Sequence, residues 1–170
     1  PSLVDDSPGG TKGTLQMPGV VGGADWGGAA VDPETGILYV PSVHSEAVIG
    51  IVPSEHPRSN MRLVLKSLAN LEGPQELPLF KPPYGRLVAI DLNKGEILWS
   101  VPNGDGPRDH PALKHLDLPP LGQPGRVSPL VTKSLVFLGE GGNSGVVVLQ
   151  PIWGGAGGKM FRAYDKMTGA

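Results

Sequence analysis

The chain has 170 residues, a length typical of one domain, and its 39% hydrophobic and 18% charged content is that of a globular protein. A formal net charge of -2 excludes a general basic field of the kind that attracts nucleic acid or anionic lipid, so no nucleic-acid partner is expected. The sequence contains no cysteine, which excludes disulfides, zinc-thiolate sites and iron-sulfur clusters.

Glycine (26 residues) and proline (19 residues) are frequent and fall between short apolar runs. This spacing is typical of many short strands joined by turns, whereas the 3.6-residue periodicity of helices is nearly absent. We therefore predict an all-β chain.

In chain order, residues 1–21 are expected to form a lead-in segment. Two hairpins are predicted after it: "GAAVD" with "GILYV", and "RLVAID" with "EILWSV". In each turn a glycine, Gly36 or Gly95, supplies the positive φ, and the aspartate that ends the first strand, Asp32 or Asp91, accepts backbone N–H bonds.

The stretch 53–83 is rich in proline and shows little alternation, so it is interpreted as an insertion. Its run "MRLVLKSLANL" fits a strand or a short helix, and the sequence does not separate the two. Further strands are predicted at "VSPLVT", "SLVFLGE" and "KMFRAYD".

One turn pattern repeats along the chain. The pattern Ala-x-Asp-x-x-x-Gly, followed at a fixed offset by tryptophan, is complete at Ala89 to Trp99, recurs at Ala163 to Gly169, and has a weaker copy at Ala30 to Gly36. Repeats of one antiparallel unit indicate a β-propeller, in which Trp99 would wedge between adjacent sheets; the alternative is an ordinary sandwich with the same turn chemistry. About two such units would not close a ring, so the chain is expected to be a fragment.

Longer motifs resemble the pyrroloquinoline quinone (PQQ)-dependent dehydrogenases, in particular the group related to quinoprotein glucose dehydrogenase. The resemblance rests on "GGADWGGAAVDPETGILYVPS", on residues 81–126, on "SPLVTKSLVFLGEG" and on "GGKMFRAYDKMTG". It implies a partial eight-bladed β-propeller of the quinoprotein alcohol dehydrogenase-like type, in which tryptophan-docking repeats latch blade to blade. Residues 1–170 would then be one incomplete propeller segment: a blade at 22–105 that holds the insertion near 53–83, and the start of the next blade at 106–170, which ends within a hairpin.

The same resemblance implies where a cofactor would lie. The loop "GGADW" is similar to a "GG-x-N-W" loop whose Asn points at the quinone in relatives, so Asp25 and Trp26 are candidate cofactor-binding residues. Trp26 would fill the space beneath the loop, or it could simply pack between strands. The loop 122–130 has the equivalent position one unit later, so Arg126 and Ser128 could face the same funnel, although Arg126 could equally be a solvated surface residue.

Asp25 departs from the family pattern, because an amide can donate to a quinone oxygen whereas an ionised carboxylate can only accept. Asp25 would therefore have to be protonated or paired with a donor such as arginine. A negative charge there would also disfavour the anionic reduced quinol. We expect this substitution to change the affinity or the potential of the cofactor.

The resemblance implies that the intact protein oxidises a sugar or alcohol hydroxyl with PQQ and a calcium-class ion. The catalytic aspartate and the metal ligands would lie outside this segment, so no catalytic residue and no metal site are expected in it, and the segment alone would be inactive. Its four histidines lack the third and fourth ligands that a zinc site needs. The implied partners are the substrate, the rest of the propeller and a respiratory quinone or cytochrome, at a periplasmic or periplasm-facing location. The alternative is a non-catalytic propeller scaffold, favoured by the Asn-to-Asp departure.

Overall fold

A computed structural model of the chain describes residues 2–19, 22–24, 27–44, 46–69, 73–141 and 158–170. The described residues form strands, turns and three short 3-10 segments, η1 (Pro74–Glu76), η2 (Gly106–Asp109) and η3 (Lys114–Leu116). This architecture confirms the all-β prediction. Among these residues, none of the helical segments has the length and apolar character that a bilayer crossing requires.

The first sheet has four antiparallel strands in the order β3-β4-β7-β8. The strands are β3 (Ala30–Asp32), β4 (Ile37–Val43), β7 (Gly85–Asp91) and β8 (Glu96–Pro102). Both predicted hairpins are confirmed, with Asp32 opposite Ile37 and Asp91 opposite Glu96. Gly36 and Gly95 have φ values of 71° and 72°, in the left-handed region that the turns require.

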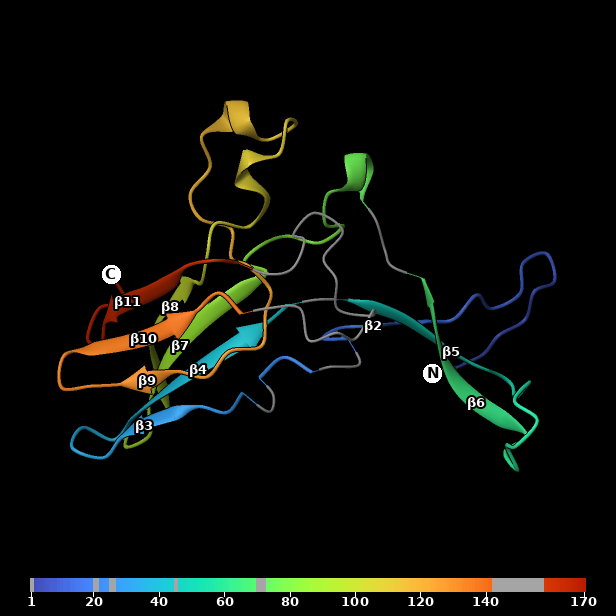
Figure 1. The fold of residues 1–170 in the computed structure, drawn as a ribbon, viewed down its shortest axis with the longest axis horizontal. Coiled ribbons are helices and arrows are strands. Elements are labelled where there is room, and N and C mark those ends of the chain that lie inside the picture. Colours follow the sequence, from blue (N-terminus) through green and yellow to red (C-terminus); the bar gives the residue numbers. More distant parts are fainter. Residues whose placement is uncertain (1, 20–21, 25–26, 45, 70–72, 142–157) are drawn as a thin grey trace.

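The second sheet contains β9 (Leu130–Val131), β10 (Leu135–Gly139) and β11 (Phe161–Asp165), in the order β11-β10-β9. All three lie within the strands predicted from the sequence. Figure 1 shows the second sheet beside the first, with the carboxyl terminus next to β11.

A third sheet projects away from these two (Figure 1). Its central strand β5 (Ala47–Pro53) pairs with β6 (Leu63–Ala69), with β2 (Thr14–Gln16) and, in parallel, with β1 (Ser2–Leu3). The run that fitted a strand or a helix is thus a strand, because β5 supplies it with a hydrogen-bonding partner. The chain leaves the first sheet after β4 and returns at β7, so the excursion is longer than the insertion near 53–83.

The core lies between the first and second sheets. Alternate residues of β4, β7 and β10 point into it, as the two-residue period of strands requires. The buried set is Ile37, Tyr39, Leu87, Ala89, Val136, Leu138 and Tyr164. The small side chain of Ala89 is fully buried in this core, which allows the close approach between sheets that the repeat predicted.

Trp99 bridges the two sheets, as the repeat predicted. Its indole Nε1 donates to the backbone oxygen of Lys166 (3.2 Å), which also accepts from the Tyr39 hydroxyl (3.1 Å). A Cβ added to Gly169 would lie 2.8 Å from the Trp99 ring, so only glycine lets the ring sit on this turn. Trp99 therefore latches β8 onto the turn that follows β11.

A buried ion pair completes this latch. The Lys166 ammonium lies 2.5 Å from an Asp32 carboxylate oxygen, and both side chains are less than a tenth exposed. Hydrogen bonds from Lys166 and then from Thr35 lower the pKa of Asp32 to about 2, while the Asp32 hydrogen bond raises the pKa of Lys166. The turn that closes β3 is thereby fixed to the turn after β11.

Candidate functional site

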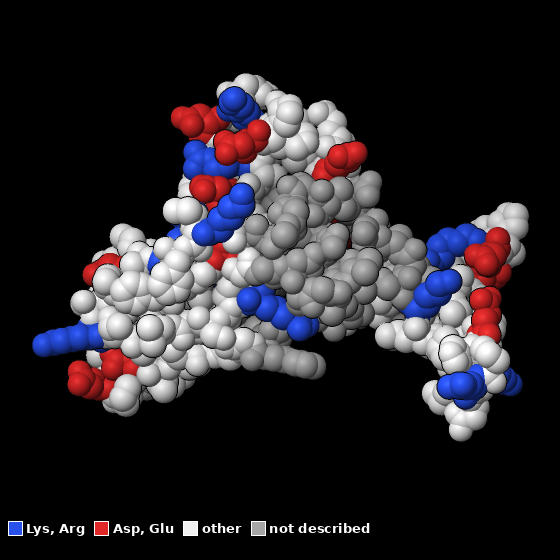
Figure 2. Space-filling model, viewed as in Figure 1, with Lys and Arg blue, Asp and Glu red and all other residues white. Residues whose placement is uncertain are grey.

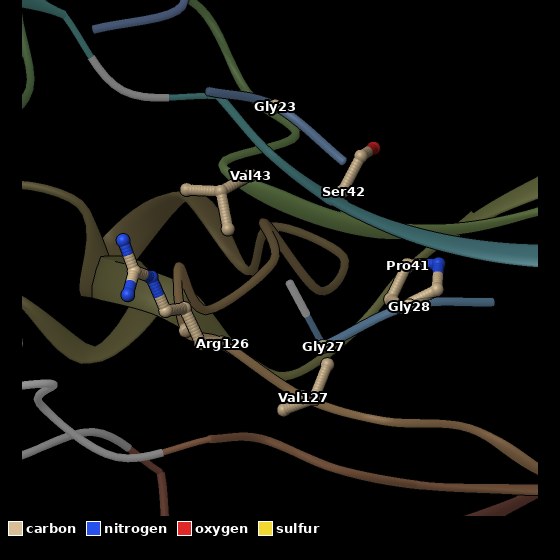
Figure 3. A pocket seen from close by; sticks show the side chains of 9 residues that line it. Gly23, Gly27, Gly28, Pro41, Ser42, Val43, Arg126 and Val127 are labelled. Atoms are coloured by element: carbon tan, nitrogen blue, oxygen red, sulfur yellow. The ribbon is translucent and has the colours of Figure 1, made fainter. Parts of the chain in front are cut away.

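The two glycine-rich loops singled out in the sequence meet at a pocket near the end of β4 (Figure 3). It is a small depression, open to solvent, with a cavity volume of about 10 Å³. Its lining residues are Gly23, Gly27, Gly28, Pro41, Ser42, Val43, Gly125, Arg126 and Val127. Pockets that enclose a whole small ligand usually exceed roughly 300 Å³, so this depression by itself encloses no such ligand.

Backbone contacts hold the first loop against the second. The Val43 amide donates to the Gly23 carbonyl (2.8 Å), which ties the first loop to β4. Gly27 lies directly on the Val127 backbone, and any Cβ at Gly27 would collide with the Val127 carbonyl oxygen. The two loops can stack only because residue 27 has no side chain.

The second loop is supported from behind by the segment that follows β10. A Cβ at Gly125 would collide with the Glu140 carbonyl oxygen, and Gly141 packs against the Arg126 carbonyl oxygen and the Val127 side chain. The loops of the first and second sheets and the end of β10 thus form three stacked layers of backbone.

Arg126 supplies the charge of the pocket. Figure 3 shows its guanidinium on the same side of β4 as Val43, whereas the Ser42 hydroxyl is directed away from it. A guanidinium offers five N–H donors in a planar fork, a geometry suited to carboxylate or quinone oxygens. The pocket wall therefore combines a cation with a glycine, Gly28, that faces open space.

The predicted site residues have different positions. Arg126 lines the pocket, as described above, while Ser128 is exposed and is not one of the lining residues. Asp25 and Trp26 lie outside the described residues. The flanking glycines, Gly23 and Gly27, are both part of the pocket wall.

A buried polar network that the sequence did not predict lies behind the pocket. Glu140 is 5% exposed and accepts from the Arg162 Nε (3.0 Å), from the Arg162 Nη2 (2.5 Å) and from the Met160 amide (3.2 Å). The same Nη2 donates to Asp105 (3.2 Å). Burial lowers the pKa of Arg162, but the Glu140 hydrogen bonds and the Glu140 and Asp105 charges outweigh it, so the pKa is raised.

Asn103 joins this network to the core. Its amide nitrogen donates to the Gly139 carbonyl (2.9 Å), and its oxygen accepts from the Tyr164 hydroxyl (2.8 Å). Burial raises the pKa of Tyr164, which keeps the phenol protonated as a donor. The end of β10 is thus held by residues that follow β8 and by residues of β11.

Two of the four histidines serve local turns. His56 Nδ1 accepts from the Arg58 amide and His110 Nδ1 accepts from the Ala112 amide, each at 3.2 Å. Within the described ranges, no group of three or more His, Asp or Glu residues converges as metal ligands would.

Charged side chains of both signs alternate over the lobe that carries η2 and η3, at the top of Figure 2. Arg108 and Asp105 pair within this lobe at 3.4 Å. Because the signs are mixed, the lobe shown in this view presents no field of a single sign.

Neighbouring antiparallel sheets that pack face to face, here latched by Trp99, are the arrangement of blades in a β-propeller domain. The chain belongs to the PQQ-dependent dehydrogenase family, because the family model described as "PQQ: Glucose/ethanol/alcohol dehydrogenase, beta-propeller domain" matches residues 6–170. The first and second sheets are accordingly propeller blades.

Individual relatives point the same way. The chain is 27% identical over 156 residues to a probable quinate dehydrogenase (quinone) of Xanthomonas campestris pv. juglandis, covering 76% of this chain and 19% of the relative. It is 27% identical over 156 residues to a quinate/shikimate dehydrogenase (quinone) of Acinetobacter baylyi strain ATCC 33305 / BD413 / ADP1, covering 75% of this chain and 18% of the relative. It is 26% identical over 156 residues to the glycerol dehydrogenase large subunit of Gluconobacter thailandicus, covering 75% of this chain and 21% of the relative. The chain thus spans about a fifth of the length of these relatives.

Proposed function

We propose that this chain is part of a quinoprotein oxidoreductase that oxidises a sugar or alcohol hydroxyl with PQQ as electron acceptor. Its two glycine-rich loops would form one wall of the cofactor funnel. The observation that supports this role most strongly is the pocket itself, where the loop similar to the family's quinone loop meets Arg126.

The residues present fit such a cofactor. PQQ is a flat quinone that carries carboxylates and, when bound, accepts two electrons from the substrate. Arg126 would hold its anionic groups through charge-assisted hydrogen bonds. Gly28 faces open space and would leave room for a ring against the backbone, and Val43 and Val127 would exclude water from that side of the site.

The metal and the other partners are part of the same proposal. A calcium-class ion, the catalytic base and the rest of the funnel would be supplied by residues outside this segment. The names of two relatives include quinone, which supports a quinone as the final acceptor, and a cytochrome is the alternative that the family resemblance implies. We propose a periplasmic or periplasm-facing location on the family resemblance.

The test uses the intact protein that carries this chain. The protein is titrated with PQQ and Ca²⁺, and dye reduction is followed with quinate, shikimate, glycerol, glucose and ethanol. Saturable quinone binding with dye reduction on any of these substrates is expected. A protein that binds no quinone would contradict the proposal and favour the non-catalytic scaffold.

Asp25 provides a sharper test within the same assay. Because an ionised carboxylate cannot donate to a quinone oxygen, Asp25→Asn is expected to change quinone affinity or redox potential. Both quantities are measured by equilibrium titration. If neither changes, Asp25 has no place in the cofactor site.

A further inference from the structure

The network behind the pocket connects segments that are far apart in the sequence. Glu140 follows β10, Arg162 belongs to β11, and Asp105 lies between β8 and η2. Arg162 binds both carboxylates through the same nitrogen, Nη2. One guanidinium therefore joins the two blades at the end of the interface that carries the pocket.

The backbone of the second loop is held between the two sides of this network. On one side, the Gly122 amide donates to the Gly104 carbonyl (2.9 Å) and the Gln123 amide donates to the Asn103 carbonyl (2.7 Å). On the other side, Gly125 lies against the Glu140 carbonyl, as described above. Any shift of residue 140 relative to residues 103–105 must therefore move the segment that carries Arg126.

The Glu140 carboxylate fixes that relative position. Its side chain is 6% exposed, and it faces the Arg162 guanidinium, the Met160 amide and the Gly104 backbone, with Gly158 packed against it. A buried carboxylate that loses its cation is left without compensation, so the surroundings must rearrange. Lysine would not replace Arg162, because a single ammonium cannot supply the Nε and Nη2 donors that Glu140 accepts from together.

We propose that Glu140 and Arg162 are positioning residues that hold Arg126 and the Gly125–Val127 wall in the position that cofactor binding requires. This inference rests on the proposed function for the identity of the ligand. The expected effect of Glu140 and Arg162 on the backbone of residues 121–127 does not depend on the ligand, because it concerns how firmly that segment is held.

The first experiment measures amide hydrogen exchange of residues 121–127 in the intact protein without quinone. Glu140→Gln is compared with Asp32→Asn, which breaks the other buried ion pair at the opposite end of the same interface. Glu140→Gln is expected to speed exchange in this segment at least about tenfold, whereas Asp32→Asn is expected to leave it within about twofold of wild type. Equal acceleration by the two variants, or none by Glu140→Gln, would overturn the inference.

The second experiment measures quinone affinity on the same variants. Glu140→Gln is expected to raise the PQQ dissociation constant about tenfold, and Asp32→Asn to leave it unchanged although its melting temperature falls. Arg162→Lys carries the same expectation and serves if Glu140→Gln does not fold. Wild-type protein that binds no PQQ would contradict the proposed function, whereas PQQ binding that is the same in wild type, Glu140→Gln and Arg162→Lys would overturn this inference alone.

Discussion

The two ends of the blade interface are each closed by a buried ion pair, but the pairs are built differently. At one end, Lys166 and Asp32 belong to turns of the repeated pattern and lie beside the Trp99 latch. At the other end, Glu140 and Arg162 belong to no repeat and lie behind the pocket. The aspartate of the first pair recurs in each copy of the turn pattern, but the position of Lys166 is taken by Pro33 and Leu92 in the other two copies, so each pair is specific to this interface.

Because of this difference, we expect mutations at the two ends to affect folding stability and ligand binding differently. Residues at the latch end contact only other structural residues, so their loss should weaken folding and leave the pocket unchanged. Residues at the pocket end support the second glycine-rich loop, so their loss should also change how a ligand is held.

The largest effect is expected at the latch. Trp99→Ala removes the indole that packs on the Gly169 turn and the hydrogen bond to Lys166, and it should lower the free energy of unfolding by about 3 kcal/mol. Ile97→Ala in the same strand is the matched control, because Ile97 is 68% exposed and its loss should cost under about 0.5 kcal/mol. Denaturant titration of the intact protein measures both, and equal losses would show that Trp99 is not a latch.

A smaller effect is expected where the loops stack. Gly27→Ala places a methyl group against the Val127 carbonyl, which should cost about 2 kcal/mol and weaken quinone binding as the loops separate. Gly28→Ala is the neighbouring control: it meets open space at a φ of 74°, so it should cost about 1 kcal/mol of backbone strain without moving the second loop. Calorimetry on both variants tests the stacking, and a stability loss in Gly27→Ala no larger than that in Gly28→Ala would contradict it; PQQ titration of Gly27→Ala tests the weaker binding.

The smallest effect concerns pH. Because the pKa of Asp32 is lowered from 3.8 to about 2 by Lys166 and then Thr35, the pair contributes stability that is complete above pH 3.8 and is lost as pH falls through about 2. The stability difference between wild type and Asp32→Asn should therefore be constant from neutral pH to about 4 and shrink below it. Thermal melts across this range test the sign, and a difference that grows on acidification would contradict it.

Local chemistry explains what the sequence could predict. The Asp-Gly turns define the hairpins, because Asp165 accepts the Met167 and Thr168 amides just as Asp91 accepts those of Asn93 and Lys94. The tryptophan offset predicted the latch for a similar reason, since the ring and its receiving turn belong to two copies of the same repeated pattern.

Long-range pairing explains what the sequence could not predict. Lys166 and Asp32 are 134 residues apart, and Arg162 and Asp105 are 57 apart, so no local spacing identifies them. The strand Ala47–Pro53 was missed because its partners come from the amino-terminal segment and from β6. A charged residue directly after an alternating strand, as Glu140 is, was the available signal for the pocket-end network.

The central claim is that the stacked glycine loops form a wall of the quinone site. The most direct measurement is an experimental structure of the intact protein with PQQ bound. The account predicts quinone density against Gly27 and Gly28, with Arg126 within hydrogen-bond distance of a quinone or carboxylate oxygen. Quinone bound elsewhere, with this pocket facing bulk solvent, would contradict it.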